Sequence, residues 1–222
     1  METQTETKIV HAKPSLLGMY TSPGDQFERI RVNPRIWMPL AIVTILSVIG
    51  SALIAMGMDA SFFIEMGTPK DQAETVVGFT KIVTVITGFL TPIFTVLISS
   101  AIYLAIAKIA GSEVKFKQLF SMNSHIMIIS ITGLILNGIV NLAIGGNPEV
   151  LVTSLAGLLN QEKTGALSAI ELFSIWNLIL VAIGLQKVGR LSKGLSWTVA
   201  IIFFLISVGF SALNGLISSV QL

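Results

Sequence analysis

Four long apolar runs dominate this chain, and none of them contains an ionisable side chain. They cover residues 36–58, 82–107, 126–144 and 197–217. A helix needs about 20 apolar residues to cross the hydrocarbon core of a bilayer, so each run is long enough. Only 12% of the residues are charged, whereas a soluble domain carries roughly a quarter. The sequence therefore predicts an integral membrane protein.

A fifth apolar run covers residues 172–185 and is too short to cross a bilayer by itself. We therefore expect its helix to begin before Glu171, which places this acid one to two turns inside the outer end of the helix. An interfacial, solvated carboxylate is one interpretation of Glu171, and a functional intramembrane acid is the other. The predicted fold class is all-α: a polytopic membrane protein with five transmembrane helices and short amphipathic surface helices.

Three of these surface helices are expected between or before the spans. Ser22-Pro23-Gly24-Asp25 is typical of a helix start, because serine caps helices, proline suits the first turn and an acid favours the positive end of the dipole. A basic amphipathic helix before a span usually lies in the headgroup layer. We expect a second such helix within residues 108–124, with Phe116, Leu119 and Phe120 on one face. A third, opened by Asn147-Pro148-Glu149, should end near Asn160.

Polar and small residues inside the spans indicate helix contacts. Asn137 and Asn141 are four residues apart and share a face, which should point at another helix, with a polar substrate path as the alternative. Pro92 lies in the middle of the second span and predicts a bend. Small residues spaced by four form three ridges, at Ser47-Ser51-Ala55, Thr87-Thr91-Thr95-Ser99 and Ser207-Ser211-Gly215-Ser219.

The positive charges predict the orientation. Eleven of the 14 Lys and Arg residues stand before the first span, between the second and third, or between the fourth and fifth. By the positive-inside rule these segments are cytoplasmic, so the N-terminus is inside and the C-terminus outside. Residues 1–14 are expected to be a disordered cytoplasmic tail. The cations considered as contacts to lipid or to a partner are Arg29, Arg31, Lys187, Arg190 and Lys193.

The sequence offers no constellation for catalysis or metal binding. It contains no cysteine and two histidines, His11 and His125, and neither is placed beside a serine nucleophile or an acid pair. We therefore expect no enzyme activity, no cofactor and no metal. The cations are spread over three short segments, which indicates membrane orientation and not a nucleic-acid groove.

Several short sequences, in order and spacing around the spans, resemble the Yip (Ypt-interacting-protein) domain family. They are Leu17-Gly18-Met19-Tyr20-Thr21-Ser22-Pro23, Phe27-Glu28-Arg29-Ile30, Gly111, Phe116-Lys117-Gln118-Leu119-Phe120, Trp176, Gly184-Leu185 and Leu191-Ser192-Lys193-Gly194. The resemblance covers residues 15–222 and implies a five-helix membrane domain with a cytoplasmic N-terminus. It is to the bacterial branch of the family, some of whose members accompany ABC transporters, and it implies no catalytic residues.

Two functions of different classes follow from these observations. The first is a non-enzymatic accessory or assembly protein of the bacterial cell membrane, which binds lipid and another integral membrane complex. The family resemblance selects an ABC exporter as that complex, and a homo-oligomer is the other partner considered. The alternative is a small-solute transporter or channel in its own right, for which Pro92, the hydroxyl ridge and the asparagine pair are the supporting features.

Overall fold

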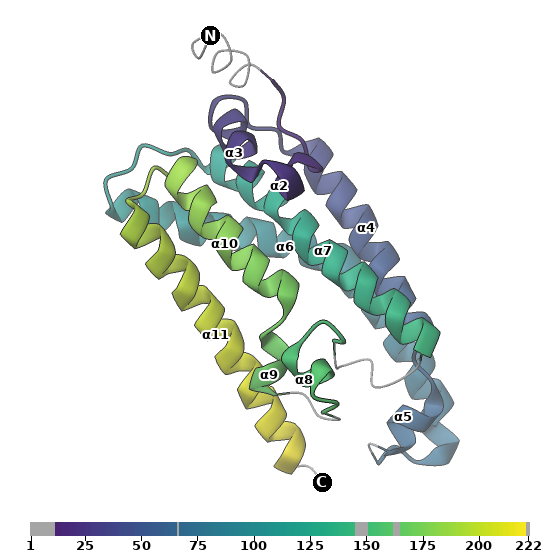
Figure 1. The fold of residues 1–222 in the computed structure, drawn as a ribbon. Helices are drawn as coiled ribbons and strands as arrows, with labels where there is room; N and C mark the ends of the chain where they lie inside the picture. The colour runs from purple at the N-terminus through teal and green to yellow at the C-terminus, as the bar shows by residue number, and fades with distance from the viewer. Residues whose placement is uncertain (1–11, 66, 145–150, 162–164, 221–222) are drawn as a thin grey trace. The chain divides into compact units, whose positions relative to one another are not determined.

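The computed structural model describes residues 12–65, 67–144, 151–161 and 165–220. Over these ranges every regular element is a helix, which confirms the all-α class, and one isolated bridge joins Ser154 to Glu171. In chain order the helices are α2 (Gly18–Thr21), α3 (Pro23–Val32), α4 (Trp37–Met56), α5 (Ala60–Glu65), α6 (Lys70–Ile109), α7 (Phe116–Ile144), α8 (Leu155–Leu158), α9 (Ala166–Ala169), α10 (Leu172–Lys187) and α11 (Lys193–Val220) (Figure 1).

Among the described residues, four helices are long and apolar enough to cross a membrane: α4, α6, α7 and α11. The polytopic membrane fold is thus confirmed. The fifth expected span differs from the prediction, because α10 has 16 residues and begins only at Leu172. Ile170 and Glu171 are not helical, so the expectation that Glu171 lies inside this helix is wrong.

The chain divides into two compact units, each assembled from three separate segments. The first unit comprises Met1–Val43, Pro92–Ser130 and Ser174–Leu205. The second comprises Thr44–Thr91, Ile131–Phe173 and Ile206–Leu222. Ten of the described Lys and Arg residues belong to the first unit and two, Lys70 and Lys81, to the second. The charge asymmetry seen in the sequence is therefore also an asymmetry between the two units.

In the first unit, α2 and α3 pack on α7 and α10 (Figure 1). The helix predicted from Ser22-Pro23-Gly24-Asp25 is present as α3, with Pro23 in its first turn and Asp25 beside it. Its apolar residues Phe27 and Ile30 are fully buried. Residues of the same chain therefore cover this face, and the expectation that the helix lies in the headgroup layer stays a prediction.

The second expected surface helix is not a separate helix but the first part of α7. Phe116 is the first residue of α7, which continues to Ile144 as a single helix. The Gln118 side chain accepts a hydrogen bond of 2.9 Å from the Lys115 backbone N–H and so caps the start. Leu119 and Phe120 are buried, so the apolar face taken for a surface helix belongs to the protein interior.

In the second unit, α4 and α6 approach each other closely. Ser47, Ser51 and Ala55 are all buried on α4, which confirms this ridge as a packing face. Gly88 of α6 lies against it: a Cβ on Gly88 would clash with Ser51 Oγ and stand 3.2 Å from the Ser47 carbonyl oxygen. Small residues on both helices permit this approach, as in other membrane helix pairs.

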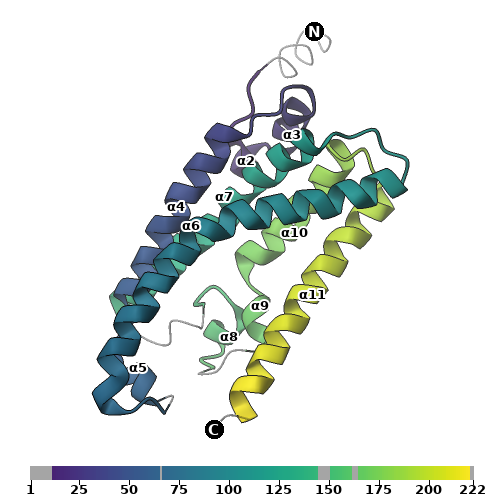
Figure 2. The ribbon, with the colours of Figure 1, turned by 180° about the vertical axis from the view of Figure 1, so that it is seen from behind.

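In the sequence, Thr68-Pro69-Lys70-Asp71 predicts a helix start of the same kind as Ser22-Pro23-Gly24-Asp25, and α6 does start directly after Thr68-Pro69. This helix has 40 residues, and Figure 2 shows it from behind. Pro92 lies inside it without interrupting the helix, and the bend expected there stays a prediction. Before α6, the Asp59 carboxylate accepts bonds from the Ser61 hydroxyl at 2.6 Å and the Ser61 amide at 2.9 Å. The Ser61 hydroxyl is the main group that lowers the pKa of Asp59 below its ordinary value, and the Phe62 and Ser61 amides add to it.

The third expected surface helix is much shorter than predicted. Its proposed start at Asn147-Pro148-Glu149 lies outside the described residues, and the helix found, α8, has four residues. Ser154 caps it by accepting a bond of 3.1 Å from the Gly157 backbone N–H. The apolar stripe of this stretch suggested a longer helix, but the bridge between Ser154 and Glu171 makes the chain extended before α8.

Candidate functional site

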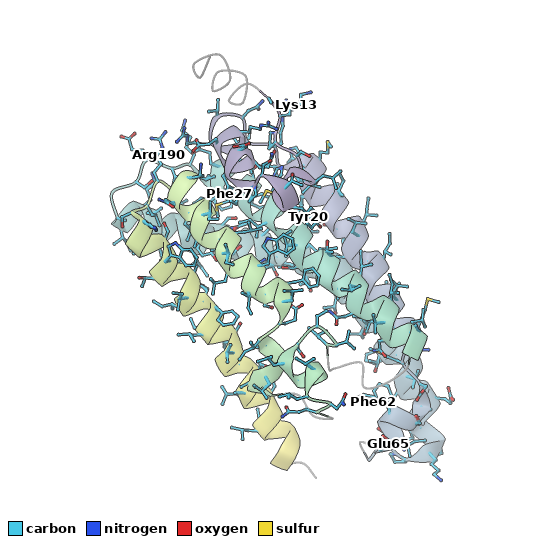
Figure 3. All side chains as sticks on the ribbon, viewed as in Figure 1. Lys13, Tyr20, Phe27, Phe62, Glu65 and Arg190 are labelled. Atoms are coloured by element: carbon cyan, nitrogen blue, oxygen red, sulfur yellow. The ribbon has the colours of Figure 1, made fainter. Side chains whose placement is uncertain are left out.

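The first candidate region is the junction of α3 with α7 and α10 in the first unit. Phe27 of α3 fits over Gly184 of α10, where a Cβ would lie 3.2 Å from Phe27 Cε1 and 2.7 Å from Met122 Sδ. The absence of a side chain at Gly184 thus makes room for two large apolar residues. Figure 3 shows Phe27 and Tyr20 lying close to α10. We call this region the α3 junction.

Directed bonds fasten the α3 junction at several points. The Tyr20 hydroxyl donates to the Ile128 carbonyl at 3.3 Å, and its ring meets Trp176 edge-on at 5.8 Å. The Gln118 amide donates to the Arg31 carbonyl at 2.6 Å. The result is a rigid contact between the segment that precedes the first span and the helices α7 and α10.

The five cations selected from the sequence separate into three kinds. Glu28 pairs with Arg31 at 2.7 Å and with Lys187 at 3.2 Å, and all three side chains are part-exposed. Such pairs contribute about 1 kcal/mol or less in water. Arg29 donates to the Lys13 carbonyl and to Gln26 Oε1, both at 3.5 Å. The structure does not bring the five into one cluster of ligands, since Glu28 already holds two of them.

Arg190 and Lys193 are the two exposed cations of the set; Arg190 lies in the turn between α10 and α11, and Lys193 is the first residue of α11. The backbone of Arg190 is left-handed, with φ of 55°. Hydrogen bonds hold the residues on both sides of Arg190. Before it, the Gly189 carbonyl accepts a bond of 2.7 Å from the Ser112 hydroxyl. After it, the Leu191 amide donates to the Leu185 carbonyl at 3.1 Å. The turn is therefore fixed by its neighbours, and Arg190 is held in a conformation that glycine adopts more readily.

We expect Arg190→Gly to raise the free energy of unfolding by about 1 kcal/mol, because a left-handed residue with a Cβ costs roughly that much. Chemical denaturation in mild detergent measures it. Arg190→Ala is the matched control, since it removes the same charge and keeps the Cβ. If Arg190→Ala stabilises as much as Arg190→Gly, repulsion among the cations is the cause, and the argument from backbone strain is wrong.

The second candidate region is a buried polar network in the second unit, formed by Asn137, Thr153 and Glu171. Glu171 is 5% exposed, so the expectation of a solvated acid is not met. The Thr153 hydroxyl donates to Glu171 Oε1 at 2.7 Å and accepts from the Asn137 amide at 2.8 Å. Asn137 also donates to the Gly133 carbonyl at 2.8 Å and accepts from the Thr153 backbone N–H at 3.2 Å. We call these three residues the Glu171 network.

Asn141 differs from Asn137 although both were expected to bond to another helix. Its Oδ1 atom is buried without a hydrogen-bond partner in the described part of the chain. It lies near Gly57, where a Cβ would stand 3.8 Å from that atom. Asn137 bonds to Thr153 in the turn before α8, and not to another helix as the sequence predicted.

This contrast predicts opposite outcomes for the two asparagines. Asn137→Leu should lower the free energy of unfolding by on the order of 1–2 kcal/mol, because Thr153 and the Gly133 carbonyl lose a partner. Asn141→Leu should cost nothing or stabilise, since it removes a buried acceptor that has no donor. Equal losses in a detergent unfolding titration would show that the two amides are equivalent and that the contrast is false.

Sequence reasoning missed several buried polar pairs. In the first unit, Asn177 donates to Ser130 Oγ at 2.9 Å, and Asn123 donates to Ser100 Oγ at 2.9 Å. Both asparagines follow the rule that singled out Asn137, an amide in an apolar helix, so the signal was available. Thr153 had no such signal, because a threonine in a connecting segment is ordinary.

The hydroxyl ridge of α6 faces outward. Thr87, Thr91 and Thr95 are exposed, and Ser99 is half-buried. Thr87 donates to the Val83 carbonyl at 2.8 Å and Ser99 to the Thr95 carbonyl at 2.6 Å, so these hydroxyls bond to their own helix. In each span, we compare the share of the most apolar 18-residue stretch that is buried inside the protein. This share is 17% in α6 and 6% in α11, compared with 39% in α4 and 44% in α7. Within the chain, α6 and α11 are thus the least covered spans.

No group of three or more His, Cys, Asp or Glu residues that could hold a metal ion occurs in the part of the chain that the structure describes. The arrangement is that of a packed helix assembly with one buried acid and two outward-facing spans. The model of the Yip1 domain matches residues 17–213. The chain belongs to the Yip1 family.

A Yip1-family relative agrees with this assignment over nearly the whole length. It is "Membrane protein YknW" of Bacillus subtilis (strain 168), 40% identical over 230 residues that cover 99% of each chain. No solved structure matches. The resemblance expected from the sequence, to a bacterial Yip protein of the YknW type, is confirmed, and the printed name of this relative states a membrane protein.

Proposed function

We propose that this Yip1-family protein is a non-enzymatic accessory protein of the bacterial cell membrane, which binds and supports another integral membrane complex. The observation that carries the proposal is the outward-facing hydroxyl ridge of α6. Thr87, Thr91 and Thr95 present small side chains that the described part of the chain leaves exposed. Small residues on a membrane helix let the backbone of another helix approach closely, whereas contact with lipid does not require small residues.

The hydroxyl bonds of this ridge support the same interpretation. Thr87 and Ser99 donate to carbonyls of α6 itself, so these two hydroxyls are already satisfied within the helix. A partner helix can pack on them through van der Waals contact. An ABC exporter is the partner that the bacterial Yip resemblance suggests, and the geometry of α6 does not choose among membrane partners.

Co-purification from native membranes under mild detergent tests the proposal. The variant is Thr91→Phe, which adds bulk to an exposed position and should leave folding intact while it reduces recovery of the partner complex. Ile86→Phe is the matched control, because Ile86 is 53% exposed on a different side of α6. Equal recovery with both variants would exclude the ridge as the contact, and recovery of a second copy alone would identify a homo-oligomer.

Transport by the protein alone is the alternative, favoured by the buried acid of the Glu171 network. A purified sample in liposomes decides between the two. The accessory function predicts that no solute gradient dissipates without a partner. Solute movement that is lost in Glu171→Gln would support a transporter and reject the accessory function.

We also propose that the N-terminus is cytoplasmic and the C-terminus external. The cations gathered in the first unit support this orientation through the positive-inside rule. A reporter fused after Leu222 should be external, and one inserted near Gly189 should be cytoplasmic. A cytoplasmic reporter at Leu222 would show that the segment from 151 to 187 does not complete a crossing.

A further inference from the structure

We propose that two turns of the first unit together form a binding surface for anionic phospholipid headgroups. One turn, residues 108–115, leads from the end of α6 to the start of α7, and the other, residues 189–193, leads from α10 to α11. We call them the joined turns, because a hydrogen bond links them. The lipid that binds there is a separate partner from the membrane complex that the protein supports.

A side chain of the first turn fixes the second turn. The Ser112 hydroxyl donates to the Gly189 carbonyl at 2.7 Å and accepts from the Val114 backbone N–H at 3.2 Å. The first turn is itself closed at the end of α6, where the Ser112 amide donates to the Ala107 carbonyl at 2.8 Å and Gly111 has a left-handed φ of 77°. The two turns are therefore held side by side (Figure 1).

The joined turns carry an excess of positive charge. They contain four cations and one acid, Glu113, and the cations are Lys108, Lys115, Arg190 and Lys193. All four cations are exposed, and none forms an ion pair with a carboxylate among the residues that the structure describes. Like charges that a fold brings together repel each other, and this repulsion is relieved when an anion binds beside them. Negatively charged headgroups supply that anion.

The position of the cations favours lipid over a soluble partner. Lys108 lies in the last turn of α6 and Lys193 is the first residue of α11, and both helices are long and apolar enough to cross a membrane. Ile109, next to Lys108, is 89% exposed. An exposed isoleucine beside cations suits the boundary of a bilayer, where acyl chains contact the apolar side chain and headgroups contact the charges. Cations at the ends of spans are also within the short range of the surface potential of an anionic membrane.

Resonance energy transfer to labelled lipid tests the proposal. The variant Ala110→Cys carries a donor dye at a single site, because the chain contains no cysteine. The full-length protein is reconstituted in phosphatidylcholine liposomes with a small fraction of phosphatidylglycerol or of phosphatidylcholine that carries an acceptor on its acyl chain. We expect several-fold more transfer to phosphatidylglycerol at low ionic strength, and a smaller difference at high salt because salt screens the charges. Equal transfer to both lipids at low salt would overturn the proposal.

Two pairs of substitutions separate this surface from the overall charge of the protein. Lys115→Gln combined with Lys193→Gln should reduce the preference for phosphatidylglycerol several-fold. Lys70→Gln combined with Lys81→Gln is the matched control, because it removes two cations that belong to the second unit. The control should keep the preference. Equal reductions by both pairs would show that net charge attracts the lipid, and would reject the joined turns as its site.

A third comparison tests whether the two turns act as one surface. Ser112→Ala removes the hydrogen bond to Gly189 without changing a charge, and it should weaken the preference for phosphatidylglycerol. Ser112→Thr keeps a hydroxyl and should restore it. An unchanged preference in Ser112→Ala would contradict a surface that depends on the joining of the turns.

Native mass spectrometry of the unlabelled protein, which counts retained phosphatidylglycerol and phosphatidylcholine molecules, replaces the transfer measurement if Ala110→Cys does not fold. An acidic protein surface is the competing occupant of the joined turns. It would be identified if the lipids bind equally while Lys115→Gln combined with Lys193→Gln loses the partner complex on co-purification. That outcome would reject the lipid site and leave the accessory function standing.

Discussion

Phe27→Ala is expected to lower the free energy of unfolding by about 3–5 kcal/mol, the usual loss for a fully buried phenylalanine. Phe27 is completely buried, and it fills the space that Gly184 leaves beside Met122. Truncation leaves a cavity at the α3 junction that neither Met122 nor Gly184 can close. Denaturant titration in mild detergent, followed by tryptophan fluorescence, measures the loss, and Trp176 reports locally because Tyr20 of the same junction contacts it.

Val32→Ala is the matched control, because Val32 ends the same helix and is 52% exposed. It should change stability by no more than about 0.5 kcal/mol. Comparing the two variants distinguishes an α3 helix that packs on α7 and α10 from one that lies only on lipid. A helix that only rests on lipid would lose similar amounts at both positions, so equal losses would contradict the junction described here.

The sequence predicted the spans because a long apolar run without charge has few alternatives in water. The runs at 36–58 and 197–217 became α4 and α11 with shifts of only a few residues at most ends. The starts at Ser22-Pro23 and Thr68-Pro69 were predicted from local chemistry, since capping and proline act within one turn. The family was also predicted correctly, from the order and spacing of short sequences around the spans.

Contacts between distant segments could not be predicted in this way. The apolar face of α3 has the pattern of a lipid-facing helix, and nothing local shows that α7 and α10 cover it. Glu171 illustrates the same limit: its neighbours in sequence are apolar, while its partner Thr153 is 18 residues away in the chain. A buried acid needs a hydrogen-bond partner, but the residue that supplies it depends on the fold.

Ridges of small residues with the same spacing can be buried or exposed. Ser47-Ser51-Ala55 is buried against α6, and Thr87, Thr91 and Thr95 are exposed on α6 itself. Both satisfy the same spacing. The ridge of α4 is buried because Gly88, one residue from Thr87, has no side chain and lets α6 approach α4 closely at Ser51.

Gly88→Val should lower the free energy of unfolding by up to about 3 kcal/mol, the upper end of the usual loss when a packed contact is overfilled. Any Cβ at this position clashes with Ser51 Oγ and stands 3.2 Å from a backbone oxygen of α4 that cannot rotate away. The side chain of valine adds two methyl groups to that clash. We therefore expect α4 and α6 to separate locally, which the same denaturant titration detects as reduced stability.

Gly78→Val separates this packing effect from helix propensity, because Gly78 lies in the same helix and a Cβ there meets nothing within 4 Å. Both variants gain the small helix preference of valine over glycine, so Gly78→Val should be neutral or slightly stabilising. Ser51→Gly in the Gly88→Val background should recover part of the loss, since it removes the side chain in the clash. The Ser47 carbonyl prevents full recovery. Equal stability of Gly88→Val and Gly78→Val would mean that α4 and α6 do not approach closely at Gly88, and would contradict the burial of the Ser47-Ser51-Ala55 ridge against α6.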